Sequence, residues 1–361
     1  MSAQNPLDES ASKELSREEI CQLPKTERLR YLGRIRIFYP LWNTITKEIQ
    51  RCHQLHPVAA EPECLLLVGP AGAGKTTLLA SYAQNYPAIF TDTATLRPVV
   101  MATTPSRANV NNLETALLTA LGDPAADKGS IGSREIRLTK YFKEICRVEL
   151  LILDELQHFW DRQSQTILQD ASNWLKTFIK ETKVSCALVG LPGEAEAIVN
   201  TNPQLASLFG DPYILSPFTW DETQPASTRD EFCTFLSMLE ERLPLKKPSH
   251  LASYEMALRC FAASDGILRY LMALIRRATY LALELEQEYL DQNLLFQAFK
   301  DRLAGERRGI PNPFADKLPD LEEIKKNKTK KQGLEGMQGT NNRSRPRNPD
   351  SPPREGSKDI F

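Results

Sequence analysis

Residues 69–76 read GPAGAGKT and follow the apolar run CLLLV. The spacing GxxxxGK[ST] is typical of a loop that binds nucleotide phosphates. Gly69 and Gly74 allow backbone angles that aim successive N–H groups at phosphate oxygens, and the following helix should present its N-terminus to the same charge. Lys75 would reach the β and γ phosphates, and the Thr76 hydroxyl would bind Mg²⁺. The residues predicted to bind ATP are Gly69, Pro70, Ala71, Gly72, Ala73, Gly74, Lys75, Thr76 and Thr77.

A second apolar run, LLILDE at 150–155, ends in two carboxylates. Asp154 at the end of a buried strand would complete the Mg²⁺ shell and contact the nucleotide, while Glu155 would orient and deprotonate an attacking water. Taken alone, this pattern also fits a strand end capped by solvated acids. Downstream of the phosphate-binding loop it favours ATP hydrolysis, with Glu155 and Lys75 as the catalytic residues.

The stretch Gly266-Ile-Leu-Arg269 lies at the expected start of a helix in the C-terminal half. An arginine at that place in a helical lid can be aimed at the γ-phosphate. The alternative is an ordinary surface arginine. We predict that Arg269 contacts the nucleotide.

Five short apolar runs alternate with helical patterns, which predicts a parallel α/β sheet. The second run leaves the sheet through polar residues. The expected strands are 64–69, 97–105, 148–155, 184–190 and 213–218, and the expected helices follow Thr77 and span 112–122, 136–146 and 173–183.

The flanks of the sheet differ in character. Residues 24–54 have the apolar spacing of an amphipathic helical region, and 229–302 are helical in pattern with no strand candidate. We therefore predict five segments. They are a disordered N-terminus (1–22), a helical lead-in with a linker (23–62), an α/β nucleotide-binding domain (63–227), a small helical lid (228–304) and a disordered basic tail (305–361).

The 361 residues are 41% hydrophobic and 25% charged, with a net charge of -1, which is ordinary globular composition. Any nucleic-acid surface must therefore come from local charge. The seven cysteines form no CxxC pair and fit buried thiols in a reducing compartment. Cys52, His53, His56 and Cys64 leave a zinc site open, although a helix end before a linker explains them too.

The N-terminal residues MSAQNPLDESASKEL fit neither a signal peptide nor a transit peptide. No apolar run approaches the roughly 20 residues that a membrane span needs. We expect an intracellular protein with no membrane partner.

The order of these motifs resembles the TnsC/TniB group of AAA+ ATPases from DNA transposons, including those of CRISPR-associated elements. The resemblance covers about residues 24–300. Its most specific parts are Gln157-His158 after the acidic pair, the LVG…EA segment, and the Asn-Pro-Gln-Leu-Ala stretch before Phe209. The supporting stretches are GPAGAGKT, PVVMATTP, LLILDELQHF, LVGLPGEAEAI, NPQLASLFG and an all-helical lid.

This resemblance implies a P-loop AAA+ fold and an ATP-dependent, DNA-binding regulator of transposition in the bacterial cytoplasm. Such proteins bind ATP between neighbouring subunits and assemble around duplex DNA as a hexameric or heptameric ring or as a helical filament. They connect a target-selection adaptor of the TniQ type to the transposase. ATP hydrolysis then drives disassembly, and Arg269 would act as the sensor-2 arginine.

Two departures from the family pattern concern hydrolysis. No Lys or Arg occurs between Lys183 and Arg229, and Leu208 stands where an arginine finger would be expected. The fourth strand ends in Gly190-Leu191-Pro192, so a polar sensor-1 side chain is missing there. An arginine finger contributes about a thousandfold or more to hydrolysis, so turnover is expected to be slow unless a cation comes from elsewhere.

No DNA-binding motif with a fixed spacing is present, so we expect sequence-independent contacts to the phosphate backbone. The resemblance implies that loops after the second strand and near the following helices line the inner channel. Each side chain would otherwise be a solvated surface group. The candidates are Thr103, Thr104, Ser106, Arg107, Ser133, Arg134, Arg137 and Lys140, with the basic tail as a further source of DNA affinity.

Two alternatives remain open. The first is an AAA+ helicase or replication loader, although no origin-binding domain or helicase-binding segment is evident. The second is a scaffold that binds ATP with little turnover, which the missing arginine finger favours. A metabolic kinase is least favoured, since nothing resembles an acceptor-substrate pocket.

Overall fold

The computed structural model describes residues 15–322 except 57, 93, 163, 222–226 and 321. The predicted basic tail beyond residue 322 and the first fourteen residues lie outside the described chain. Within the described residues, no helix combines the length and the apolar character that a membrane span requires.

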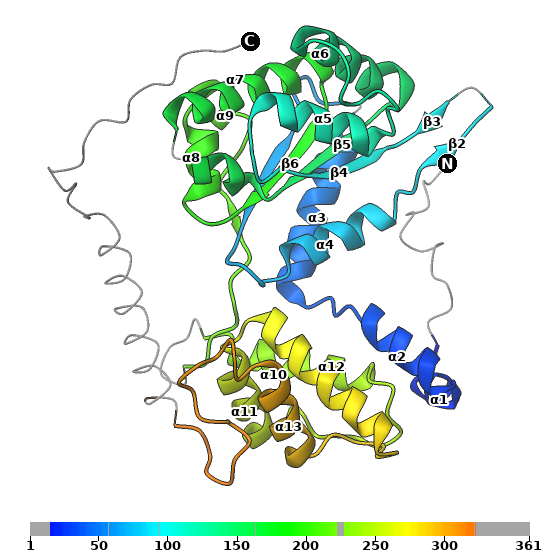
Figure 1. Ribbon diagram of the computed structural model, residues 1–361, viewed down its shortest axis with the longest axis vertical. Coiled ribbons are helices and arrows are strands. Elements are labelled where there is room, and N and C mark those ends of the chain that lie inside the picture. The colour runs from blue at the N-terminus through cyan, green and yellow to red at the C-terminus, as the bar shows by residue number, and fades with distance from the viewer. Residues whose placement is uncertain are drawn as a thin grey trace, which may run out of the picture.

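A five-stranded parallel sheet forms the centre of the upper part of the molecule (Figure 1), and this confirms the predicted AAA+ type of α/β fold. The strand order is β4-β5-β6-β1-β7, and every pair of neighbours is parallel. Their carboxyl ends therefore meet at one edge, which places the residues after β1, β5 and β6 side by side. The bounds are β1 Cys64–Val68, β4 Val99–Thr103, β5 Leu150–Asp154, β6 Ser185–Gly190 and β7 Tyr213–Ile214.

Alternating residues of each strand face two separate cores, as the two-residue period of a strand requires. Leu150 and Ile152 of β5 belong to one core, and Leu151 and Leu153 belong to the other. The first core is covered by α3 (Pro40–Leu55) and α4 (Lys75–Gln84). Helices on the opposite face are α5 Val110–Leu121, α6 Ile131–Lys140, α7 Gln165–Thr182 and α8 Glu194–Asn200.

Short elements complete the α/β part. A π-helical turn, η1 (Tyr141–Ile145), extends α6, a 3-10 segment, η2 (Leu156–Arg162), follows β5, and α9 (Pro203–Ala206) follows α8. The sequence did not predict the antiparallel hairpin β2 (Ile89–Phe90) and β3 (Thr95–Leu96). Each of its strands has only two residues, too few to give a periodic pattern, and the hairpin projects from the sheet layer in Figure 1.

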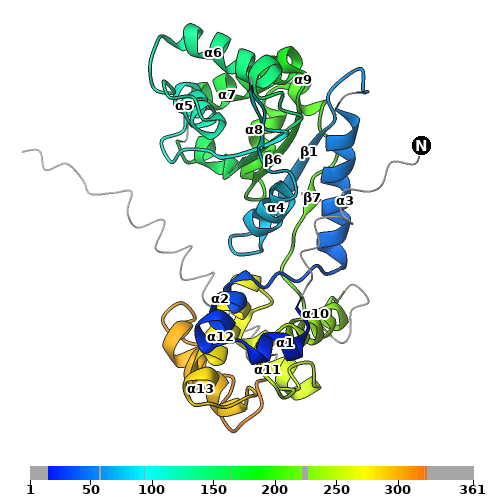
Figure 2. The same ribbon diagram turned by 90° about the vertical axis from the view of Figure 1, so that its right-hand side faces the viewer.

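Four helices form the lid below the sheet (Figures 1 and 2). They are α10 Arg229–Glu241, α11 Tyr254–Ser264, α12 Leu268–Glu284 and α13 Gln292–Arg302. The apolar residues of these helices continue the first sheet core, so lid and sheet share one packed interior.

The N-terminal lead-in contacts both layers. Helices α1 (Arg17–Gln22) and α2 (Lys25–Arg34) lie beside the lid in Figure 2. Arg28 of α2 donates to the carbonyl oxygen of Pro244 at 2.9 Å and pairs with Glu288 at 2.6 Å. Helix α3 then packs along the sheet, so residues 35–39 cross from lid to sheet beside the phosphate-binding loop.

Folded structure extends further toward both ends than predicted. Residues 17–22 are helical because Ser16 and Glu19 form a reciprocal capping box, a local signal that apolar periodicity does not capture. At the other end, Phe314 is buried, and the Arg259 guanidinium donates to the carbonyl oxygens of Pro313 at 2.6 Å and Ala315 at 2.7 Å. Residues 305–315 are therefore part of the lid rather than of a tail.

Candidate nucleotide-binding site

The loop between β1 and α4 has the backbone of a phosphate cradle. Gly72 and Gly74 have φ values of +84° and +102°, a region that side-chain-bearing residues rarely adopt. Gly69 has a different role from the one expected, because it is not among the positive-φ residues. A Cβ on Gly69 would lie 2.5 Å from the carbonyl oxygen of Leu215, so the residue is small to allow close approach of the segment after β7.

The Lys75 ammonium is held inside this loop. Its Nζ donates to the carbonyl oxygens of Gly69 at 2.6 Å and Pro70 at 3.2 Å. Burial lowers the pKa of Lys75, and the carboxylates of Asp154 and Glu155 oppose that shift. A buried cation whose partners here are neutral carbonyls is a strong electrostatic site for an anion.

Thr76 and Asp154 come together as predicted. The Thr76 hydroxyl donates to Oδ2 of Asp154 at 2.6 Å, and the Asp154 residue is 1% exposed. A hydroxyl oxygen and a carboxylate oxygen are the hard ligands that Mg²⁺ prefers. The pair therefore fits the predicted ion, which Thr76 and Asp154 would hold and whose charge would offset that of the phosphates.

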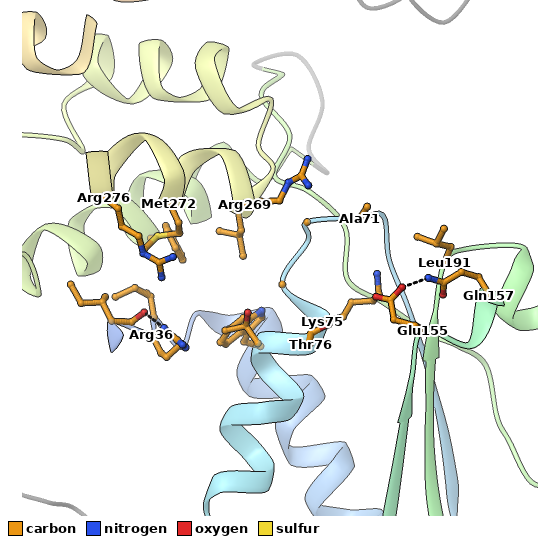
Figure 3. A pocket seen from close by; sticks show the side chains of 18 residues that line it. Arg36, Ala71, Lys75, Thr76, Glu155, Gln157, Leu191, Arg269, Met272 and Arg276 are labelled. Carbon is orange, nitrogen blue, oxygen red and sulfur yellow. Dashed lines mark hydrogen bonds between the residues drawn. The ribbon is translucent and has the colours of Figure 1, made fainter. Parts of the chain in front are cut away.

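Glu155 follows the strand with a strained backbone, φ +59°, and its N–H donates to Oδ1 of Asp154 at 2.8 Å. This conformation turns the Glu155 side chain into the pocket, where Figure 3 shows its carboxylate near the end of Lys75. The carboxylate accepts a hydrogen bond from Nε2 of Gln157.

A cavity of about 400 Å³ connects these groups with the lid (Figure 3). Ala71, Gly72, Gly74, Lys75, Thr76 and Thr77 line it on the side of the loop. Besides two arginines, the far end is lined by apolar side chains from the lead-in and the lid. These side chains are Ile35, Ile37, Trp42, Phe235, Leu268 and Met272. An apolar slot beside a phosphate cradle is suited to the base and sugar of a nucleotide.

Sequence reasoning missed this slot because its residues come from two segments far apart in the chain. Their signal was the amphipathic pattern of 24–54 and of the lid, which identifies a buried face but not its partner. The lid also closes directly on the loop, since the N–H of Arg269 donates to the carbonyl oxygen of Gly72 at 3.0 Å.

Of the residues that the structure describes, three arginines line the cavity, and Arg269 is the one that the sequence singled out. In Figure 3 its side chain points away from Lys75. It pairs with Glu306 at 3.0 Å and lies over the Tyr270 ring. Its predicted contact with the nucleotide would require a different rotamer.

The other two arginines, Arg36 and Arg276, lie at the end of the cavity opposite Glu155 (Figure 3). Burial, and then the nearby Arg36 charge, lower the pKa of Arg276. Among the described residues, neither guanidinium forms an ion pair, and Nε of Arg276 is buried without a hydrogen-bond partner. Both add positive charge to a pocket predicted to bind a polyanion.

The structure separates the proposed DNA-contacting residues. Thr103, Ser106 and Arg107 are exposed at the carboxyl end of β4, whereas the exposed Lys140 ends α6, which leads through η1 to the amino end of β5. Lys140 therefore lies away from the sheet edge at which Thr103, Ser106 and Arg107 are exposed.

Three further candidates have internal partners or are buried. Thr104 is 1% exposed. Arg134 lies 3.8 Å from the buried Glu114, and Arg137 pairs with Asp123 at 2.7 Å. Ser133 remains exposed at the start of α6.

The four residues considered for zinc do not form a site. Both ring nitrogens of His53 are engaged, Nδ1 with the Tyr82 hydroxyl at 2.9 Å and Nε2 with Glu149 at 3.0 Å. Among the described residues, no group of three or more His, Cys, Asp or Glu could hold a metal ion.

Leu208, which stands where an arginine finger would be expected, packs against the second core.

Comparison with known proteins gives a family and a fold. A family model described as bacterial TniB protein matches residues 28–218, more than half of the chain. None of the curated protein sequences compared with this chain matches it. Among solved structures, the ORC2 protein of Aeropyrum pernix, in ADPNP and ADP complexes, is similar with a TM-score of 0.55 and 17% identity over 76% of this chain and 72% of that chain.

The Cdc6p protein of Pyrobaculum aerophilum is similar in the same way, with a TM-score of 0.53 and 17% identity over 78% of this chain and 74% of that chain. Identities this low support the shared fold alone. The match to the family model covers the phosphate-binding loop, the acidic pair, the whole sheet and most of the lead-in.

Proposed function

This chain belongs to the TniB family, and we propose that it is an ATPase of the bacterial cytoplasm that regulates DNA transposition. In this proposal it binds ATP and Mg²⁺, assembles on duplex DNA as a ring or filament, and links a target-selection adaptor to the transposase. ATP hydrolysis takes the assembly apart.

The observation that carries the proposal is the position of the phosphate cradle between sheet and lid. Lys75, Thr76 and Asp154 belong to the sheet layer, while the apolar slot belongs to the lead-in and the lid. A nucleotide in the cavity would contact both layers at once. Its binding energy can therefore fix the lid relative to the sheet, and this is how a small ligand controls an assembly surface.

Hydrolysis at this site would follow the usual displacement at phosphorus. The oxygen of a water forms a bond to the γ-phosphorus, the bond to the bridging oxygen breaks, and ADP leaves with that oxygen. The proton lost by the water passes to the Glu155 carboxylate. Lys75 offsets the charge on the phosphate oxygens.

Self-assembly would complete the site. No Lys or Arg lies between residues 183 and 229, so this segment supplies no cation to a neighbour's nucleotide. A second copy would have to contribute such a charge from another element, and duplex DNA would bring the copies together. Sequence-independent contacts suit this role, since a platform for insertion must bind many sites.

Electron microscopy of the purified protein tests the assembly. With duplex DNA and either ATP or a slowly hydrolysed analogue, we expect rings or filaments threaded on DNA, and no such particles without nucleotide. Monomers that ignore DNA under every condition would contradict the proposal and favour a loader whose partner is a protein.

Neutralising the exposed cations tests the mode of DNA contact. Arg107→Gln should weaken binding equally on all sequences and reduce the slope of log K against log salt by about 1, because one phosphate is no longer neutralised. Lys140→Gln tests the second position separately, because it lies away from Arg107. Fluorescence anisotropy over a salt series measures the slope, with Lys180→Gln on α7 as a matched surface control. Weaker binding on some sequences only would contradict recognition of the DNA backbone.

The scaffold alternative remains because of the missing arginine in 184–228. It shares the nucleotide site and the assembly with the main proposal and differs only in turnover. Substitution of Glu155, the proposed general base, separates the two.

A further inference from the structure

Gln157 is a buried amide beside the proposed general base. It lies on η2, directly after β5, and is 7% exposed. Its Nε2 donates to Oε2 of Glu155, and Figure 3 shows the two side chains meeting at one end of the cavity. An ionised carboxylate only accepts hydrogen bonds, so the amide nitrogen must face Glu155 and the amide oxygen must face away.

That amide oxygen has no hydrogen-bond partner in the described part of the chain. Oε1 of Gln157 is buried without a hydrogen bond to any described residue. A buried acceptor left without a donor destabilises the fold, and a bound ligand or an ordered water commonly supplies the missing donor. Oε1 itself is covered, but Gln157 lines the nucleotide cavity, so a small rotation of its side chain would bring Oε1 to a water held there.

Gly190 at the end of β6 leaves the space that this amide occupies. A Cβ on Gly190 would lie 3.1 Å from Oε1 of Gln157 and 2.9 Å from Cβ of Ala195. The glycine that deprives the strand end of a polar side chain is thus the residue that admits the side chain of Gln157. The lack of a side chain at residue 190 therefore explains two features: the strand end has no polar group, and the Gln157 amide fits beside it.

We propose that Gln157 positions the water that attacks the nucleotide, in place of a side chain at the end of β6. Its Nε2 fixes the Glu155 carboxylate, and its Oε1 accepts a hydrogen bond from one hydrogen of the water. The other hydrogen faces Glu155, which takes it as a proton when the oxygen bonds to the γ-phosphorus and ADP departs. Gln157 keeps its own protons throughout. This inference rests on the proposed ATPase function.

A purely structural role would have a different signature. In that case Gln157 would do no more than stabilise the strained backbone of Glu155. Its loss would then lower the thermal stability and would weaken nucleotide binding and turnover together. A water-positioning residue acts on kcat and leaves nucleotide binding intact.

The kinetic test compares Gln157→Leu with the wild-type protein. We expect kcat for ATP to fall about 10- to 100-fold while KM stays within about twofold. Gln169→Leu, the same change at an exposed glutamine of α7, should leave both values unchanged. In a Glu155→Gln background, Gln157→Leu should cause little further reduction, because the two residues act on one water.

A second variant does not alter the amide. Gly190→Ala places a methyl group against Oε1 and should lower kcat in the same way. A third measurement needs no turnover: in nucleotide-free protein labelled with ¹⁵N, Glu155→Ala should shift the side-chain amide signal of Gln157, which is assigned by its disappearance in Gln157→Leu.

The outcomes separate the two proposals. Unchanged kcat in both Gln157→Leu and Gly190→Ala, with turnover abolished by Glu155→Gln, overturns the role of Gln157 and leaves the ATPase standing. An amide signal that ignores Glu155→Ala overturns it too. If the wild-type protein hydrolyses no ATP with DNA present, the proposed hydrolysis fails and this inference fails with it.

Discussion

Lys75→Ala is expected to abolish nucleotide-dependent DNA binding. The ammonium is the buried cation of the phosphate-binding loop, and its hydrogen-bond partners here are the carbonyl oxygens of Gly69 and Pro70. Phosphate oxygens would replace those neutral partners with charge-assisted hydrogen bonds. Without the cation we expect the affinity for ATP to fall about 100-fold or more.

The same substitution should not unfold the protein. Burial lowers the pKa of Lys75, so the folded chain holds the charged form at a cost. Removing the ammonium removes that cost together with two hydrogen bonds to neutral carbonyls. The free energy of unfolding without nucleotide should therefore change little, and a failure to bind DNA can be attributed to the nucleotide.

Two measurements check this prediction. Isothermal titration calorimetry gives the ATP affinity, and DNA anisotropy with and without ATP gives the coupling. Lys180→Ala, an exposed lysine of α7, is the control. DNA binding by Lys75→Ala that still rises with ATP would sink the proposed coupling between nucleotide and assembly.

The sheet and the phosphate site were predictable because their signals are local. Five apolar runs of strand length alternate with helical patterns, and Gly69, Gly74 and Lys75 lie within one short stretch of the chain. The carboxyl ends of parallel strands meet at one edge of a sheet. Asp154 ends one such strand and Thr76 follows another, so their proximity could be expected from the sequence.

The rest of the site depends on contacts between distant segments. Trp42 and Met272 share one cavity although they lie near opposite ends of the folded chain, and no local pattern predicts that meeting. Arg269 pairs with Glu306, which the sequence pattern placed in a tail. Arg134 was predicted to contact DNA, but it is buried 3.8 Å from Glu114 of another helix, a pairing that no local pattern indicates.

Gln157 illustrates the same limit within one motif. The family resemblance marked the residue, but only the folded chain places its amide between Glu155 and the end of β6, where Gly190 has no side chain. The sequence alone showed a missing polar group at the end of β6. In the structure, the amide of Gln157 reaches this place from η2, the segment that follows the neighbouring strand β5.

The substitution Glu155→Gln distinguishes an ATPase from a scaffold that binds ATP without turnover. Gln has the shape of Glu and can keep the backbone at φ +59°, but its amide cannot accept a proton at neutral pH. If Glu155 is the general base, kcat should fall about 100-fold or more while the affinity for ATP is retained.

The assembly should respond in step with turnover. With ATP present, particles of Glu155→Gln on DNA should outlast those of the wild-type protein, because hydrolysis would no longer release the subunits. Phosphate release and the decay of DNA-bound particles after dilution measure the two effects, with Glu181→Gln, an exposed acid on α7, as the control. If turnover and disassembly are identical in Glu155→Gln and wild type, Glu155 is not a catalyst. The nucleotide would then act as a structural ligand, and the positive charge of Lys75, Arg36 and Arg276 around the cavity would serve binding alone.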